Sequence, residues 1–274
     1  MSESGLCVAC EAGGVAGAPP AAPQPYPYAQ PAPPAHAAPP YAPAPRLPAH
    51  LASPEGLARA AVVLLGVCAL TDVLSLFAGY TMLGVANRMV DNPGFVTQDE
   101  VDRADLLEAG SGLVQTLALL ASAVVFVIWF RRVRINAEVF RPDGHRMRRG
   151  WAVWAWITPA VCLWFPKKMA NDVWAASLPY GPDGSPRRAP RTVMNWWWGL
   201  WIATLVLGRA SGRMYIRAES PEEIRQAVVA LMVSDVLDIV AAVVAVLFVR
   251  RLTALQHEKA HQGPVAPYQA PVFR

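Results

Sequence analysis

Three aspartates lie inside stretches of the sequence that are otherwise apolar. Asp72 is near the middle of a run over residues 57–86, and Asp235 and Asp238 are near the middle of another over 227–249. Asp235 and Asp238 are three residues apart, so they share one face of a helix. A carboxylate at the centre of a bilayer costs about 3 kcal/mol or more on insertion scales, and such residues normally face a bundle interior and line an ion, proton or substrate path.

No Lys or Arg lies at a matching depth to neutralise these carboxylates. They would therefore be protonated, bind a cation, or accept hydrogen bonds from hydroxyl and amide side chains in the same or neighbouring runs. Candidate donors are Ser75, Ser234, Thr204 and Asn195. A structural alternative is that each aspartate only holds helices together through hydrogen bonds. The sequence leaves both interpretations open.

Other chemistry is not indicated. Cys7 and Cys10 form half of a zinc-ribbon ligand set, and no second Cys pair follows them. Since a structural zinc needs four ligands, we expect no metal, and no cofactor motif is present either. The sequence contains no Gly-rich phosphate loop, no His-Glu-x-x-His and no Gly-x-Ser-x-Gly, and its five His lie away from the aspartates. We therefore expect a protein that is not an enzyme.

The composition identifies the elements that must position the aspartates as membrane helices. Hydrophobic residues make up 54% of the chain and charged residues 16%, a balance that argues against a water-soluble fold. Apolar runs occupy residues 57–86, 109–130, 193–207 and 227–249. We predict an all-α polytopic protein with these four runs as transmembrane helices.

A fifth apolar stretch, residues 151–166, is short for a crossing and carries Pro159 in its middle. Residues 167–178 then follow the pattern of an amphipathic, interfacial helix. Basic loops belong in the cytoplasm, and clusters of Arg follow residues 130 and 249. All basic clusters stay cytoplasmic if 151–166 enters the membrane and returns, so we predict a re-entrant segment with both termini cytoplasmic. A fifth crossing is the alternative.

Two further sets of residues are candidates for contact with lipid. The basic set follows the second apolar run and consists of Arg131, Arg132, Arg134, Arg146, Arg148 and Arg149. These cations would contact anionic headgroups, or they would only stop translocation. The aromatic set comprises Trp151, Trp154, Trp196, Trp197 and Trp198. We expect these to form an interfacial belt, with a ligand-binding aromatic pocket as the alternative.

The ends of the chain differ from its centre. Residues 1–55 form a Pro/Ala-rich segment that we predict to be a disordered cytoplasmic tail, and 256–274 a disordered C-terminal tail. Residues 56–255 are then the transmembrane domain. The basic residues flank apolar runs, so nucleic acid is not an expected partner. Expected partners are membrane lipids, cytoplasmic proteins that bind the Pro-rich tail, and a second copy of the chain.

The central part of the sequence resembles a known bacterial family. It contains WFRRVRINAEVF over residues 129–140, a Trp–Phe–Pro exit at Trp164, a Trp-Ala-Ala-Ser motif from Trp174 to Ser177, and a Trp-rich helix from residue 193. This succession is similar to the membrane-protein family named domain of unknown function 4328, from the first helix to about residue 255. Relatives often begin with a Cys-pair zinc-ribbon head, of which only Cys7 and Cys10 are present. The resemblance implies a helical protein of the bacterial cell membrane and no known activity.

Three functions fit these features. The first is a non-enzymatic scaffold or sensor whose Pro-rich tail binds cytoplasmic partners. The second is a small transporter or channel that uses Asp72, Asp235 and Asp238, and the third is a lipid-interacting protein. If the aspartates of the two runs face one another inside the bundle, transport is favoured. If each instead finds a single donor on a separate helix, the scaffold is favoured.

Overall fold

The computed structural model describes residues 51–263, which belong to one compact unit of the chain. The elements are α1 (Glu55–Asp91), η1 (Pro93–Phe95), α2 (Gln98–Phe140), α3 (Trp151–Ile157), η2 (Val161–Leu163), α4 (Phe165–Ala176), α5 (Thr192–Arg217) and α6 (Pro221–His261). Apart from one isolated bridge between Tyr180 and Pro186, these residues form no β-structure. The predicted all-helical fold is confirmed.

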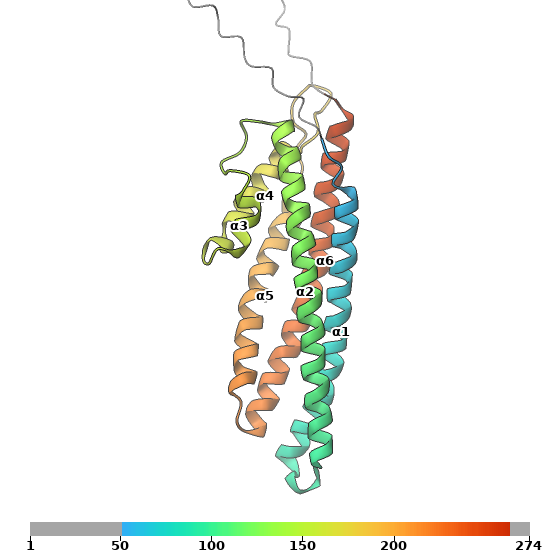
Figure 1. The fold of residues 1–274 in the computed structure, drawn as a ribbon, viewed down its shortest axis with the longest axis vertical. Coiled ribbons are helices and arrows are strands. Elements are labelled where there is room, and N and C mark those ends of the chain that lie inside the picture. The colour runs from blue at the N-terminus through green and yellow to red at the C-terminus, as the bar shows by residue number, and fades with distance from the viewer. Residues whose placement is uncertain (1–50, 264–274) are drawn as a thin grey trace, which may run out of the picture. The chain divides into compact units, whose positions relative to one another are not determined.

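Two long antiparallel hairpins form the body of this unit (Figure 1). One joins α1 to α2 through η1, the other joins α5 to α6, and α1 packs along α6 between them. The chain turns at α6 through a capping box, in which Ser220 Oγ accepts from the N–H of Glu223 and the Glu223 carboxylate accepts from the N–H of Ser220. The α1–η1–α2 hairpin extends farther than the α5–α6 turn (Figure 1).

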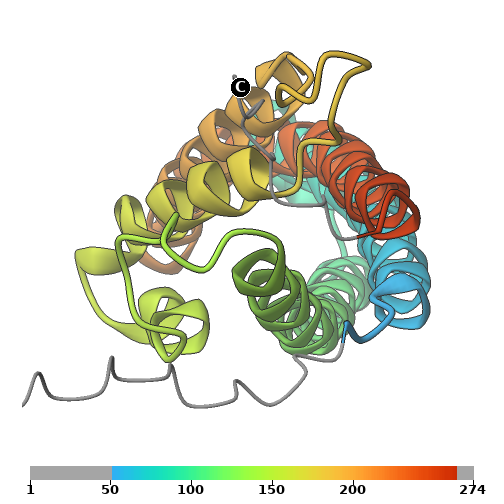
Figure 2. The ribbon, with the colours of Figure 1, turned by 90° about the horizontal axis from the view of Figure 1, so that it is seen from above.

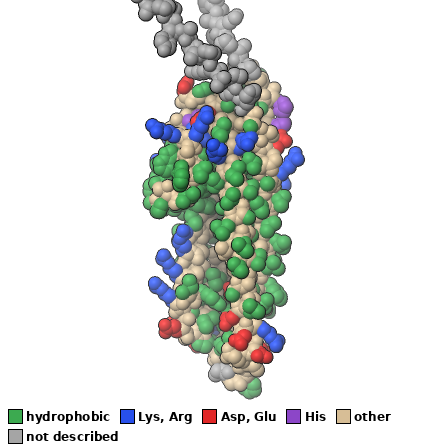
Figure 3. All heavy atoms as spheres, in the orientation of Figure 1, with side chains coloured by type: hydrophobic (Ala, Val, Ile, Leu, Met, Phe, Trp, Pro, Cys, Tyr) green, Lys and Arg blue, Asp and Glu red, His purple; other side chains and the backbone are tan. Residues whose placement is uncertain are grey.

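Three of the helices, α1, α2 and α6, are long and apolar enough to cross a membrane. Their outward faces carry large apolar side chains that a water-soluble protein would bury. Examples that are between 54% and 65% exposed are Val63, Leu70 and Phe77 on α1, Leu113, Leu117 and Leu120 on α2, and Val233 and Val243 on α6. Figure 3 shows hydrophobic side chains spread over the middle of the visible face. Together these features indicate a membrane protein.

Helix α5 is less apolar than the other three long helices. Its 26 residues include Asn195 and four Trp before the apolar stretch of residues 202–207 and Arg209 after it, so this stretch is short. The predicted fourth crossing therefore lacks the long continuous apolar run that marks α1, α2 and α6. In space, however, α5 runs antiparallel to α6 along much of its length (Figure 1).

The short Trp/Pro-rich segment folds back on itself. Helix α3 ends at Ile157, and a γ-turn follows in which the Val161 N–H donates to the Pro159 carbonyl at 2.6 Å. Ala160, the central residue, has φ +60° and ψ −46°, the uncommon form of this turn. As a result the ring of Trp151 lies 5.0 Å from that of Phe165, so the chain returns to the level from which it started.

The largest core lies at the end of the unit that holds α3 and α4. Figure 2 views that end, where α3 and α4 both pack against α2. Trp129, Trp174 and Phe248 are fully buried there, and Trp197 stacks on Phe248 with ring centroids 4.2 Å apart. The Nε1 of Trp129 donates to Thr253 Oγ1 at 3.2 Å. Aromatic packing thus joins α2, α4, α5 and α6.

Hydrogen bonds of two buried side-chain amides also join the helices at this end. Gln256 Nε2 donates to the carbonyl of Val133 at 2.7 Å and to Ser177 Oγ at 3.1 Å. Asn136 donates to Gln256 Oε1 at 3.2 Å and exchanges two hydrogen bonds with the backbone of Ala52. Ala52, three residues before α1, is therefore fixed to α2, and through Asn136 to α6. The boundary predicted at residue 255 falls inside α6, which continues to His261.

Candidate proton-binding site

One glutamine joins two of the three predicted aspartates. Gln115, on α2, donates through Nε2 to Asp72 Oδ1 on α1 at 2.8 Å and to Asp235 Oδ1 on α6 at 2.9 Å. A carboxamide nitrogen carries two hydrogens, so both bonds form at once. Asp72 and Asp235 are each 7% exposed. The three helices that are apolar enough to cross a membrane thus meet at a single polar centre.

Hydroxyl groups complete this centre. Ser75 and Ser234 are buried close to the aspartates, whereas the buried Thr71 donates its hydroxyl to the carbonyl of Cys68 at 2.8 Å. Ser234 Oγ donates to Asp238 Oδ2 at 3.4 Å. Helix α5 also approaches here, because a Cβ on Gly208 would lie 3.7 Å from Ser234 Oγ. Asp238 lies one helical turn beyond Ser234, so the polar centre extends along α6 toward α5.

The centre contains acid without a compensating base. No ion pair among residues 51–263 includes Asp72, Asp235 or Asp238. Within the same residues, no three His, Cys, Asp or Glu side chains are placed to hold a metal ion. Carboxylates that face one another in a poorly solvated environment cannot all ionise cheaply. Protonation is the chemical route by which such a group lowers its charge.

Gln115 was not among the residues singled out from the sequence. A signal was present, because it is the single carboxamide in the apolar run of residues 109–130. An unpaired amide inside a membrane helix requires a partner as much as a carboxylate does. The donors that were predicted take a smaller part: Ser234 bonds Asp238, whereas Asn195 accepts a bond from Lys167 at the other end of α5.

Half of the predicted headgroup cations are engaged with acidic residues. Arg134 is buried and pairs with Glu138 at 2.7 Å, Arg146 pairs with Asp172 at 3.3 Å, and Arg149 also contacts Glu138. Burial lowers the pKa of His145 in the same loop, so this ring stays neutral near pH 7. Among the described residues, Arg131, Arg132 and Arg148 form no ion pair and remain available to lipid.

The predicted aromatic set divides between surface and core. Trp154 and Trp196 are 63% and 64% exposed, Trp151 and Trp198 are half-buried, and Trp197 is buried in the aromatic core. Cys7 and Cys10 lie outside the described residues.

A family model covers most of this helical unit. It is described as a domain of unknown function, DUF4328, and it matches residues 92–254, more than half of the chain. The chain belongs to the DUF4328 family. The resemblance seen in the central sequence is confirmed, although the DUF4328 match begins after α1. Gln115, Asp235 and Asp238 therefore lie inside the DUF4328 region, and Asp72 lies before it. No curated protein and no solved structure is significantly similar to the chain.

Proposed function

We propose that this DUF4328 protein is a small proton-coupled transporter or proton channel whose proton-binding groups are Asp72, Asp235 and Asp238. The observation that carries the proposal is the Gln115 bridge, which brings carboxylates from two helices face to face without a cation. Such groups bind and release protons at the midplane of many membrane carriers. The chemistry is proton transfer between carboxylates, with no covalent intermediate.

The proposed topology has four crossings, with α5 as the fourth, α3 and η2 as a half-helix, and both termini cytoplasmic. Its support is a set of contacts at one end of the unit. Asp172 of α4 accepts from the N–H of Arg146, which places α4 at the same end as the basic loop that follows α2. Gln262 exchanges two hydrogen bonds with the backbone of Tyr180, which places the loop before α5 at that end too.

The scaffold or sensor role remains a separate prediction. It depends on the Pro-rich segment of residues 1–50, which lies outside the described residues. Binding of cytoplasmic proteins to that segment would be compatible with proton movement through the helices.

Proton flux into liposomes tests the proposed function. The full chain is reconstituted with an entrapped pH-sensitive dye, and a potassium diffusion potential supplies the driving force. We expect proton uptake by the native chain and a loss of about tenfold or more in Asp235→Asn, because the amide cannot take up the proton. Asp105→Asn is the matched control, since Asp105 is exposed near the start of α2, and its flux should be unchanged.

A second measurement separates transport from a structural role. If Asp72→Asn and Asp235→Asn keep native proton flux but lower the thermal unfolding midpoint, the aspartates only hold helices together and the proposal fails. If Gln115→Leu also removes flux, the bridge itself positions the carboxylates.

A further inference from the structure

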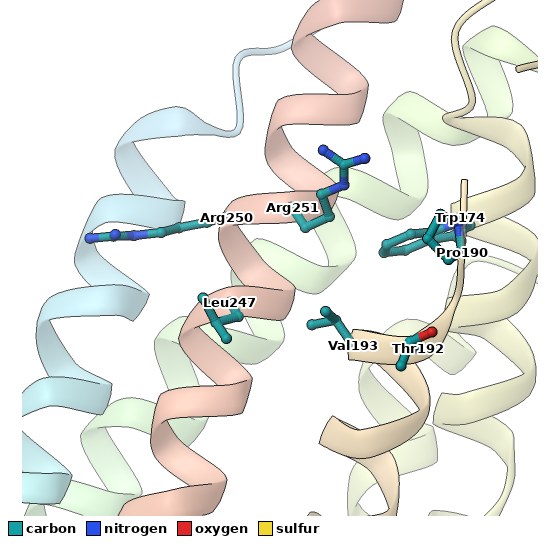
Figure 4. A pocket seen from close by; sticks show the side chains of 7 residues that line it. All are labelled: Trp174, Pro190, Thr192, Val193, Leu247, Arg250 and Arg251. Atoms are coloured by element: carbon teal, nitrogen blue, oxygen red, sulfur yellow. The ribbon is translucent and has the colours of Figure 1, made fainter. Parts of the chain in front are cut away.

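A groove lies between α6 and the start of α5, well away from the carboxylate centre. It has a volume of about 390 Å³ and is open to the surface. Figure 4 shows Leu247 and Val193 along one part of it, and Arg251 and Trp174 along the part nearer the end of α6. No Asp or Glu lines it. The groove therefore has an apolar part and a cationic part.

Free hydrogen-bond donors surround the cationic part. Arg251 is exposed, and it has no ion-pair partner in the part of the chain that the structure describes. Figure 4 shows it on the side of α6 that faces Trp174, whereas Arg250 extends toward α1. Trp174 is fully buried, and its Nε1 has no hydrogen-bond partner among residues 51–263. A buried N–H without an acceptor is costly, so a ligand in the groove that supplied an acceptor to it would be stabilised.

The start of α5 adds a second, independent set of donors. The N–H groups of Thr192, Val193 and Met194 have no acceptor within the described residues, and no side chain caps this helix. The first turn also contains no acidic residue. A helix N-terminus in this state carries partial positive charge and binds anions. The guanidinium of Arg251 and the first turn of a 26-residue helix thus converge on one small volume.

The position of the groove defines the class of anion. Leu247 is one helical turn before Arg251 and belongs to the apolar run of α6, so the groove lies where that run ends. A free phosphate would use the donors and leave Leu247 and Val193 uncovered. A phospholipid would place its phosphate at Arg251 and the α5 N-terminus and its acyl chain on the two aliphatic side chains.

We propose that this groove binds the phosphate of an anionic phospholipid from the cytoplasmic leaflet. The site is distinct from the basic loop of residues 131–149, and it does not depend on proton transport. A phospholipid with no net charge should bind less tightly. Phosphatidylcholine, for example, carries a cation beside its phosphate.

Native mass spectrometry of the full-length protein in detergent tests this site. The protein is titrated with phosphatidylglycerol and, separately, with phosphatidylcholine. We expect the glycerol lipid to bind at least about fivefold more tightly. Arg251→Gln should weaken its binding by about fivefold or more, as loss of one cation near a headgroup predicts. Trp174→Phe, which keeps the ring and removes the N–H, should weaken it by about threefold.

Arg131→Gln is the matched control. Arg131 follows the apolar run of α2 as Arg251 follows that of α6, it is also exposed, and it lies outside the groove. Equal losses in Arg131→Gln and Arg251→Gln would mean that only general charge attracts lipid, and the proposal would be overturned. It would also be overturned if millimolar inorganic phosphate displaced the lipid completely, since the groove would then be a site for soluble anions. An unchanged unfolding midpoint in Trp174→Phe shows that its effect is on binding.

Discussion

Lys167, at the start of α4, is held in a confined polar site. Its Nζ donates to the carbonyl of Met194 at 3.2 Å and to Asn195 Oδ1 at 2.5 Å. Burial, and then the charge of Arg191, lower the pKa of Lys167 to about 8 from its usual 10.5. The ammonium therefore loses its proton far more easily than an exposed lysine does.

We predict that acylation of Lys167 by a small amine-reactive reagent increases with pH with a midpoint near pH 8, because only the neutral amine of Lys167 reacts. Arg191→Gln should move this midpoint upward, since it removes the charge that disfavours the ammonium. Quantitative peptide mass spectrometry of the labelled protein measures both midpoints. Arg188→Gln is the control, and a midpoint that moves equally in both variants would contradict the role of Arg191.

The same shift fixes the sign of a stability effect. Between pH 8 and 10.5 the unfolded chain still binds the proton that folded Lys167 has lost. The free energy of unfolding therefore rises with pH across this window. Below the folded pKa both states bind the proton, and the destabilisation by the buried ammonium is fully present.

At the scale of residues, the sequence alone identified the charged side chains of the site but not how they pair. Asp72, Asp235 and Asp238 stand out because acid in an apolar run is costly wherever it lies. Their pairing through Gln115 depends on the rotation of three helices, and no local pattern specifies that. The pairing of Arg134 with Glu138 follows the i,i+4 spacing and was within reach of the sequence.

Helices α1 and α6 pack closely at Gly79. A Cβ at this position would lie 3.0 Å from Met232 Cγ, and Val228 is also near. Small residues at such crossings allow membrane helices to pack tightly. The crossing is one or two turns from Asp72 and Asp235, so its spacing controls the length of the Gln115 bridge.

We predict that Gly79→Leu destabilises the protein by about 1–3 kcal/mol, as overpacking usually does, and reduces proton flux by widening the bridge. Gly84→Leu is the matched control on the same helix, because nothing lies within 4 Å of a Cβ there. Thermal unfolding in detergent measures the first effect and the liposome assay the second. Equal midpoints for the two variants would show that the α1–α6 crossing is not tight.

At the scale of elements, the long apolar helices followed directly from the sequence and the short ones did not. Length and hydropathy specify α1, α2 and α6. The reversal between α3 and α4 rests on one γ-turn at Ala160, a residue with no preference for positive φ. Its conformation is imposed by packing, including the contact of Trp151 with Phe165. Pro159 predicted an interruption there, though not its geometry.

For the whole molecule, the arrangement of the four long helices predicts which segments share a side of the membrane. Single cysteines replace residues in a chain without its native Cys, at exposed positions whose side chains bond nothing in the structure. Suitable variants are Gly94→Cys, Arg188→Cys, Glu219→Cys and Ala260→Cys. We expect a membrane-impermeant thiol reagent to label residues 94 and 219 in intact cells and to spare 188 and 260.

The opposite pattern has a definite meaning. Labelling at 188 and 260 with protection at 219 would require residues 151–166 to cross the membrane. That result would separate α4 from the basic loop and contradict the contact between Arg146 and Asp172. The proposed half-helix and the cytoplasmic lipid groove would both fail.

The two hairpins differ in length, and in the proposed topology this difference determines which of them extends farther outside the cell. Gln98 is 17 residues before Gln115 on α2, about 26 Å along the helix, whereas half of the hydrocarbon layer is about 15 Å. Pro221 is 14 residues before Asp235 on α6, about 21 Å. With the carboxylate centre at the midplane, the α5–α6 turn lies among the headgroups and the tip at residues 91–97 rises above them. If both termini are cytoplasmic, as we propose, this tip is the first point that an antibody or a protease outside the cell would reach.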